Sequence, residues 1–159
     1  MTNWRFLWVH FTIVFALLLL VMPLPAAVNL FRPDWPLLVL SYWVLALPHR
    51  VSIGTAFVVG FFVDVMVGTV LGVNALGYSI MAFILAANYA KIRNFSILQQ
   101  SLLLGLLLAF FHLLIFWLSH FLTGVSFRMA YLWPVLTGML LWPYIFLFLR
   151  RMRRKLKIQ

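Results

Sequence analysis

The feature that most constrains this chain is a series of long apolar stretches with almost no charge. Of its 159 residues, 66% are hydrophobic and only 9% are charged, whereas an ordinary soluble domain carries about 25% charged residues. A water-soluble fold of this size could not bury so much apolar surface, so the solvent must be a lipid bilayer. Because hydrocarbon satisfies no backbone hydrogen bonds, only helices or a closed barrel can cross it.

The order of the apolar residues decides between helices and a barrel. Barrel strands alternate apolar and polar residues at about every second position. The runs 11–21 and 102–111 do not alternate, so they predict helices. We expect one all-α, polytopic membrane domain over residues 1–159, with apolar segments at about 6–22, 35–47, 53–71, 74–90, 97–122 and 131–149.

The second apolar segment leaves the number of spans open. It is much shorter than the others and is framed by Pro33, Pro36 and Pro48. At about 1.5 Å per residue it does not reach across a hydrocarbon core of about 30 Å. We expect a six-helix transmembrane bundle, and the alternative is five spans with a short or re-entrant second segment.

Lys and Arg residues set the orientation, because cytoplasmic ends carry the excess of positive charge. With six spans, the outer side receives only Arg32 and Arg128. The other side receives Arg5, Arg50, Lys91, Arg93 and a juxtamembrane tail over 150–159 with the basic residues Arg150, Arg151, Arg153, Arg154, Lys155 and Lys157. The tally is equally uneven with five spans, so the C-terminus is predicted to be cytoplasmic either way. The net charge of +10 then indicates topology and contact with anionic lipid, not nucleic-acid binding.

The third segment carries small residues at every fourth position. Residues at this spacing form one ridge on a helix, and a ridge of small side chains lets another membrane helix approach closely. Packing within the chain is the favoured interpretation, and an interface with a separate protein is the alternative. The ridge consists of Ser52, Ala56, Gly60, Asp64, Gly68 and Gly72.

Asp64, in the middle of this ridge, is the only acidic residue inside a predicted span. A carboxylate at the centre of a bilayer costs about 2.5–3.5 kcal/mol, so a partner, water or a proton must compensate its charge. His112 in the fifth segment lies at a compatible depth, and a buried Asp64–His112 pair is one such solution. A structural role is favoured over a proton relay, because relays chain several ionisable groups.

A second polar feature is the sequence Arg32-Pro33-Asp34-Trp35 at the outer entry of the second segment. Asp34 can pair with Arg32 or, with six spans, with Arg128, and so shape a docking surface. Signatures of catalysis are missing: the spans hold a single carboxylate, and the sequence has no P-loop, H-E-x-x-H or G-x-S-x-G motif. We therefore expect no enzyme activity, no cofactor and no metal.

Three stretches together resemble the MreD family of rod shape-determining membrane proteins. They are Arg32-Pro33-Asp34-Trp35, then the residues from Tyr42-Trp43 through Ala46-Leu47-Pro48-His49-Arg50, then the run Gly60, Asp64, Gly68 and Gly72 at four-residue spacing. The apolar segments and the basic tail also suit the family.

This resemblance implies a function that the residues alone do not. Members act in the bacterial inner membrane, in the elongation machinery that guides lateral peptidoglycan synthesis. The expected direct partner is MreC, with MreB, RodA and a class B penicillin-binding transpeptidase contacted through the complex. The family's fold is similar to that of the substrate-binding subunits of energy-coupling-factor transporters. A small-solute or lipid-binding transport component is therefore the alternative function.

Overall fold

The computed structural model describes residues 3–157, and this part of the chain is helical apart from its connecting turns. The prediction of an all-α fold is therefore confirmed over the described residues. In chain order the elements are α1 (Asn3–Val21), α2 (Ala26–Asn29), α3 (Trp35–Ala46), α4 (Ile53–Val67), α5 (Val73–Ala87), α6 (Tyr89–Arg93), α7 (Ile97–Thr123), the 3-10 helix η1 (Met129–Leu132) and α8 (Trp133–Lys155).

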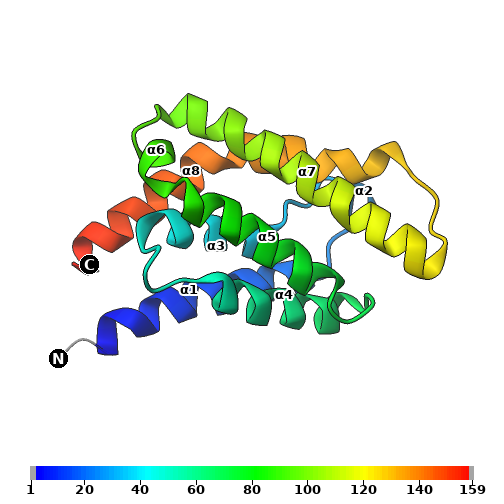
Figure 1. Cartoon of the computed structure of the whole chain (residues 1–159), viewed down its shortest axis with the longest axis horizontal. Coiled ribbons are helices and arrows are strands. Elements are labelled where there is room, and N and C mark those ends of the chain that lie inside the picture. Colours follow the sequence, from blue (N-terminus) through cyan, green and yellow to red (C-terminus); the bar gives the residue numbers. More distant parts are fainter. Residues whose placement is uncertain (1–2, 158–159) are drawn as a thin grey trace.

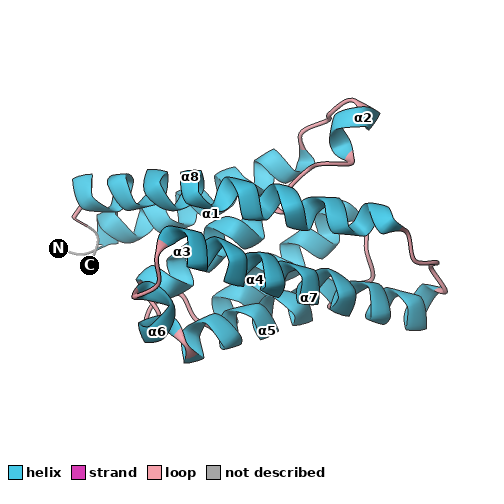
Figure 2. Ribbon diagram, turned by 90° about the horizontal axis from the view of Figure 1, so that it is seen from above, coloured by secondary structure: helices cyan, strands magenta, loops and turns pink. Residues whose placement is uncertain are grey.

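The longer helices lie side by side along the long axis of the molecule (Figure 1). α3 is at the centre, where it contacts α1, α5 and α8. α4 packs on α5, and α5 in turn packs on α7, which pairs with α8. The beginning of α1 and the end of α8 lie at the same end of the bundle, and the short α2 stands out near the opposite end (Figure 2).

The central helix α3 corresponds to the short second segment of the sequence. Its side chains are buried on all sides, and Leu38 and Trp43 are both 0% exposed. The Trp43 Nε1 group donates a hydrogen bond of 2.9 Å to Thr12 Oγ1 of α1. A helix that is apolar all round belongs inside a protein, and the structure uses α3 in this way. Whether this segment crosses the membrane stays a prediction.

The observed helix ends refine the expected segments. The third segment was expected to reach residue 71, but α4 ends at Val67 because Gly68 takes a left-handed φ of 74°. The last segment extends beyond residue 149, since α8 continues through the basic tail to Lys155. Of this tail, Ile158 and Gln159 lie outside the described residues. By length and composition, two stretches of the described chain suffice to cross a membrane, Ile97–Thr123 and Met129–Lys155.

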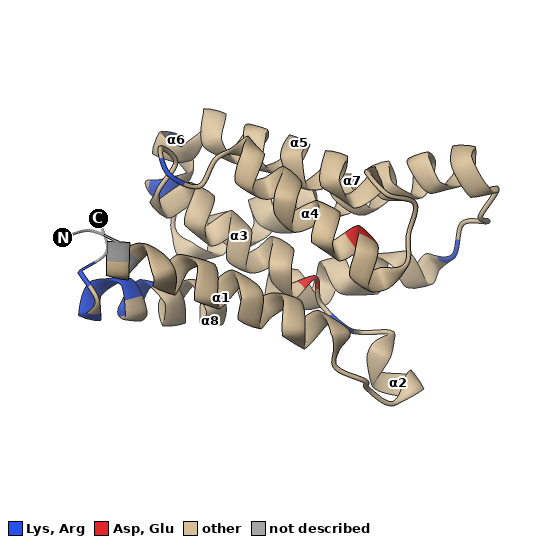
Figure 3. Ribbon diagram, turned by 90° about the horizontal axis from the view of Figure 1, so that it is seen from below, with Lys and Arg blue, Asp and Glu red and all other residues tan. Residues whose placement is uncertain are grey.

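Charge is distributed unevenly along the bundle. Most Lys and Arg residues gather at the end where α1 begins and α8 finishes, whereas the two acidic residues lie away from it (Figure 3). This separation leaves the basic end without nearby carboxylate side chains.

Candidate functional site

The turn between α4 and α5 encloses the carboxylate of Asp64, which is 0% exposed. Its Oδ1 atom accepts hydrogen bonds from Thr69 Oγ1 at 2.7 Å and from the backbone and side-chain nitrogens of Asn74 at 3.0 and 2.9 Å. Its Oδ2 atom accepts from the backbone N–H groups of Gly72 at 2.9 Å and Ala75 at 3.2 Å. Five hydrogen bonds therefore compensate the buried carboxylate.

Two glycines explain why the chain folds this way around Asp64. Gly68 and Gly72 have φ values of 74° and 98°, a left-handed conformation that glycine adopts without steric cost. They reverse the chain so that the first turn of α5 meets the end of α4. The N–H groups of a first helical turn have no partner within the helix and attract negative charge. Asp64 thus caps the N-terminus of the following helix.

The buried half of the small-residue ridge makes a contact within the chain. Ala56 is 0% exposed, and a Cβ atom added at Gly60 would lie 2.6 Å from the Ala75 Cα atom. α5 therefore occupies the surface of this half. The ridge ends at Asp64, because Gly68 and Gly72 belong to the turn and not to α4. At the other end Ser52 is exposed.

The expected pair between Asp64 and His112 is not formed. The hydrogen bonds described for Asp64 all come from the turn and the start of α5. The His112 Nε2 atom is buried with no hydrogen-bond partner among the described residues. The pair was a reasonable solution for a carboxylate in lipid, but backbone N–H groups already use the oxygens of Asp64. His112 instead lines a cavity of about 350 Å³ with Thr69, Ser119 and Tyr131.

The outer motif is arranged around Asp34. Its Oδ1 atom accepts a hydrogen bond of 2.6 Å from the Tyr78 hydroxyl and a longer one of 3.4 Å from the Leu37 backbone, which caps α3. Burial raises the pKa of the Asp34 carboxyl from 3.8 to about 6, and the hydrogen bond from Tyr78 acts in the opposite direction. Tyr78 is a site residue that the sequence did not reveal, because it lies in an apolar segment far along the chain.

The cations expected beside Asp34 have other positions. Arg32 donates a hydrogen bond to the backbone carbonyl of Met22, and Arg128 precedes η1 in an extended conformation. Pro33 is buried and Trp35 begins α3. The partners of Asp34 described in the structure are therefore a hydroxyl and an N–H group rather than an arginine.

The basic tail continues α8 and has two faces. Arg150 and Arg153 are half-buried and face the end of α3, where Arg153 donates a 3.5 Å hydrogen bond to the Ala46 carbonyl. The other basic residues of the tail are exposed: Arg151, Arg154, Lys155 and Lys157.

A groove of about 530 Å³ lies between α1 and α4. Its lining is mainly apolar, with Val14, Leu17, Val58 and Phe62, and includes the small residues Gly54 and Thr55. The described residues contain no cluster of three His, Asp or Glu side chains able to hold a metal ion.

Comparison with known proteins gives the family. A family model described as rod shape-determining protein MreD matches residues 2–152. The rod shape-determining protein MreD of Haemophilus influenzae is 40% identical over 158 residues, which cover 97% of this chain and 98% of that protein. No solved structure matches the chain. The chain therefore belongs to the MreD family of rod shape-determining proteins, which are membrane proteins with a role in cell shape.

Proposed function

We propose that this chain is a non-enzymatic inner-membrane subunit of the bacterial cell-elongation machinery. It binds MreC directly and helps to organise lateral peptidoglycan synthesis and rod shape. Through the complex it meets MreB, RodA and a class B penicillin-binding transpeptidase. The observation that carries the proposal is the family match, which extends over nearly the whole chain.

The bundle geometry supports a multi-pass topology with six spans and a cytoplasmic C-terminus. The beginning of α1 and the end of α8 lie at the same end of the bundle, and that end carries most of the Lys and Arg residues (Figure 3). An even number of crossings brings both ends to one side, and the positive charge assigns that side to the cytoplasm. The likeness to energy-coupling-factor subunits is part of the same proposal.

The groove between α1 and α4 is the surface that we assign to the transmembrane helix of MreC. Helices in lipid associate through close packing and not through the hydrophobic effect, so small residues mark their contacts. The ridge around Gly60 is already covered by α5, whereas the small residues Gly54 and Thr55 line an open apolar groove. A single partner helix can lie along it.

A transport component remains the second candidate, because one cavity suits a small solute. The cavity near the α4–α5 turn has a volume of about 350 Å³ and is lined by His112 and the hydroxyl-bearing Ser119 and Thr123. The buried Nε2 atom of His112 has no hydrogen-bond partner within the described chain. Depletion of the protein in its host distinguishes the two functions. An assembly subunit predicts round, lysis-prone cells, whereas a transport component predicts a nutrient requirement with normal cell shape.

Co-purification with MreC after extraction in mild detergent tests the assembly function and the groove together. A Gly54→Phe substitution places a large side chain at the groove, and its Cβ atom has room because the nearest atom is Ser52 Oγ at 3.7 Å. We expect this variant to retain less than a tenth of the MreC that the original chain retains. Leu106→Phe is the matched control, since Leu106 is 70% exposed on α7, and it should retain MreC fully. Equal recovery with both variants contradicts the groove, and no recovery with the unmodified chain contradicts the assembly function.

A further inference from the structure

The basic end of the bundle contains a pocket that the proposed function does not use. The central helix α3 has only 12 residues and is about 18 Å long at about 1.5 Å per residue. It ends at Ala46, while α8 continues past it to Lys155. The space beyond the end of α3 is a pocket of about 160 Å³.

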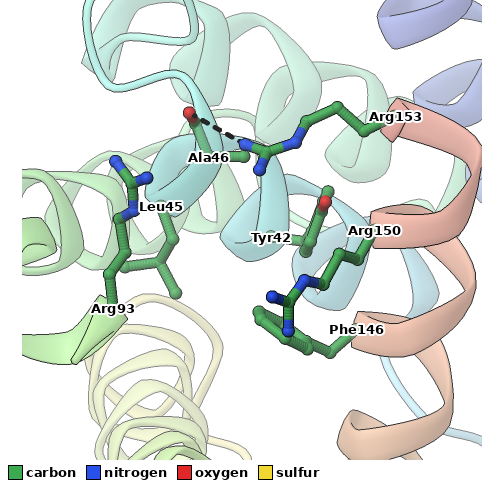
Figure 4. A pocket seen from close by; sticks show the side chains of 7 residues that line it. All are labelled: Tyr42, Leu45, Ala46, Arg93, Phe146, Arg150 and Arg153. Carbon is green, nitrogen blue, oxygen red and sulfur yellow. Dashed lines mark hydrogen bonds between the residues drawn. The ribbon is translucent and has the colours of Figure 1, made fainter. Parts of the chain in front are cut away.

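Three arginines from two helices surround this pocket (Figure 4). Arg93 ends α6, and Arg150 and Arg153 lie one turn apart on α8. Arg153 donates a hydrogen bond to the Ala46 carbonyl, which explains its position as a cap of α3. Arg93 and Arg150 have no such described hydrogen bond that would account for their positions beside the pocket. The chain has only two acidic side chains, and both take part in hydrogen bonds away from this end.

The pocket also has a buried hydroxyl group with an unused capacity to donate. Tyr42 is 2% exposed, and its hydroxyl has no hydrogen-bond partner among residues 3–157. Leaving a buried donor unpaired is costly. Arg93, Arg150 and Arg153 line the same pocket as this side chain. A ligand that accepts hydrogen bonds and carries negative charge satisfies both the hydroxyl and the arginines.

The size and the position of the pocket limit the kinds of ligand that it can bind. Sites for whole small molecules usually have volumes of about 300–1,000 Å³, so 160 Å³ suits one anionic group. Guanidinium groups match phosphate oxygens in charge and in geometry. Leu45, Ala46 and Phe146 make the remaining wall apolar, which suits the glycerol and acyl part of a lipid better than a free ion. The exposed arginines and lysine beside the pocket place it at the membrane surface.

We propose that this pocket binds the phosphate group of an anionic phospholipid in the leaflet at the basic end of the bundle. Arg93, Arg150 and Arg153 hold the phosphate oxygens, and the Tyr42 hydroxyl donates to one of them. The lipid then joins α6 to α8 over the end of α3, in addition to any general attraction of the tail to anionic lipid. The headgroup beyond the phosphate stays outside the pocket but close to the three arginines, which repel a cationic choline and not an uncharged glycerol.

Native mass spectrometry of the full chain in neutral detergent tests this site. Phosphatidylglycerol, phosphatidylcholine and inorganic phosphate are titrated separately. We expect phosphatidylglycerol to bind at least tenfold more tightly than phosphatidylcholine. The double variant Arg93→Gln/Arg150→Gln should lose about tenfold or more of this affinity, and Tyr42→Phe, which keeps the ring contact with Phe146, should lose severalfold.

The matched control is Arg151→Gln/Lys155→Gln, which removes the same amount of charge from exposed positions of α8 outside the pocket. It should keep the preference for phosphatidylglycerol. Equal losses in the two double variants would mean that surface charge alone attracts the lipid, which overturns the site. Inorganic phosphate that binds as tightly as the lipid would assign the pocket to a soluble anion and overturn the lipid as its ligand. Circular dichroism of each variant identifies any loss that comes from unfolding.

Discussion

At the scale of single residues, the molecule accommodates its two carboxylates by the same means. Asp34 accepts from the Leu37 N–H group at the start of α3, and Asp64 accepts from N–H groups at the start of α5. Both also accept from a hydroxyl group, that of Tyr78 or of Thr69. The positive end of a helix is a fixed, local compensation for a buried negative charge. A carboxylate held in this way does not need a cation from another helix.

The first prediction concerns the replacement of Asp64. In Asp64→Ala, the N–H groups of Gly72, Asn74 and Ala75 lose their acceptor, and each buried unpaired group costs about 1–3 kcal/mol. We expect the thermal midpoint of the detergent-solubilised protein to fall by several degrees or the folded monomer to be lost, as measured by size-exclusion chromatography after a heating series. Asp64→Asn keeps one acceptor oxygen, so its thermal midpoint should lie between those of the original chain and of Asp64→Ala. A fully stable Asp64→Ala variant contradicts the capping role.

The environment of Asp64 also shows where sequence reasoning stops. The cost of a lone carboxylate in lipid predicts that something must compensate it, and this requirement is met. The sequence suggested the side chain of His112, because a histidine is visible in a sequence and a free N–H group is not. The signal for the observed solution was the pair Gly68 and Gly72, which form a tight turn. Their four-residue spacing made them resemble a continuation of the helix ridge.

At the scale of elements, glycines determine how closely the helices approach. A Cβ atom at Gly60 would lie 2.6 Å from the backbone of α5, and one at Gly77 would lie 2.7 Å from the Phe111 ring of α7. At Gly105 the nearest atom is Met139 Sδ of α8, also at 2.7 Å. The pairs α4–α5, α5–α7 and α7–α8 thus each have a glycine at their contact. Such contacts are how helices without a hydrophobic driving force associate.

The second prediction compares these glycines. Gly60→Ala places its methyl group against backbone, which cannot move aside, so we expect a loss of about 1–3 kcal/mol. Gly105→Ala meets a flexible methionine side chain and should cost less. In Gly54→Ala the methyl group makes only an ordinary contact with Ser52 Oγ, so the change should be neutral or stabilising, because alanine favours a helix by about 1 kcal/mol over glycine. Thermal midpoints in one detergent give the ranking, and equal midpoints for the three variants would contradict the packing model.

At the scale of the whole molecule, the bundle has a central helix, α3, that is shorter than α1, α5 and α8, which pack around it. The sequence predicted where helices lie, because long apolar runs leave little choice. It did not predict that the segment 35–47 forms the core. The signal was present, since α3 lacks a polar face, but in a chain this apolar the other segments lack one as well. The contacts that place α3 at the centre join residues far apart in the sequence, such as Thr12 and Trp43.

The last prediction concerns the number of crossings. The chain has no cysteine, so a single introduced cysteine reports the side on which it lies. Phe31 stacks edge-on against Trp133 with ring centroids 4.8 Å apart, which ties the end of α2 to the start of α8 and so to the loop 124–128. If six segments cross, Asn29→Cys must then face the same side as Ser126→Cys. If the second segment does not cross, residue 29 lies on the other side, with the tail.

A maleimide that does not pass the membrane distinguishes these topologies in intact spheroplasts, and all three positions are exposed for labelling. We expect Asn29→Cys and Ser126→Cys to react at similar rates before lysis, and Lys155→Cys to react only after lysis. Protection of Asn29→Cys to the same degree as Lys155→Cys would establish five spans. The ring contact between Phe31 and Trp133 would then have to be broken in the membrane, because its two partners would lie on opposite sides. Only the six-span topology keeps Phe31 and Trp133 on one side of the membrane and also places both ends of the chain on the side with the excess of Lys and Arg.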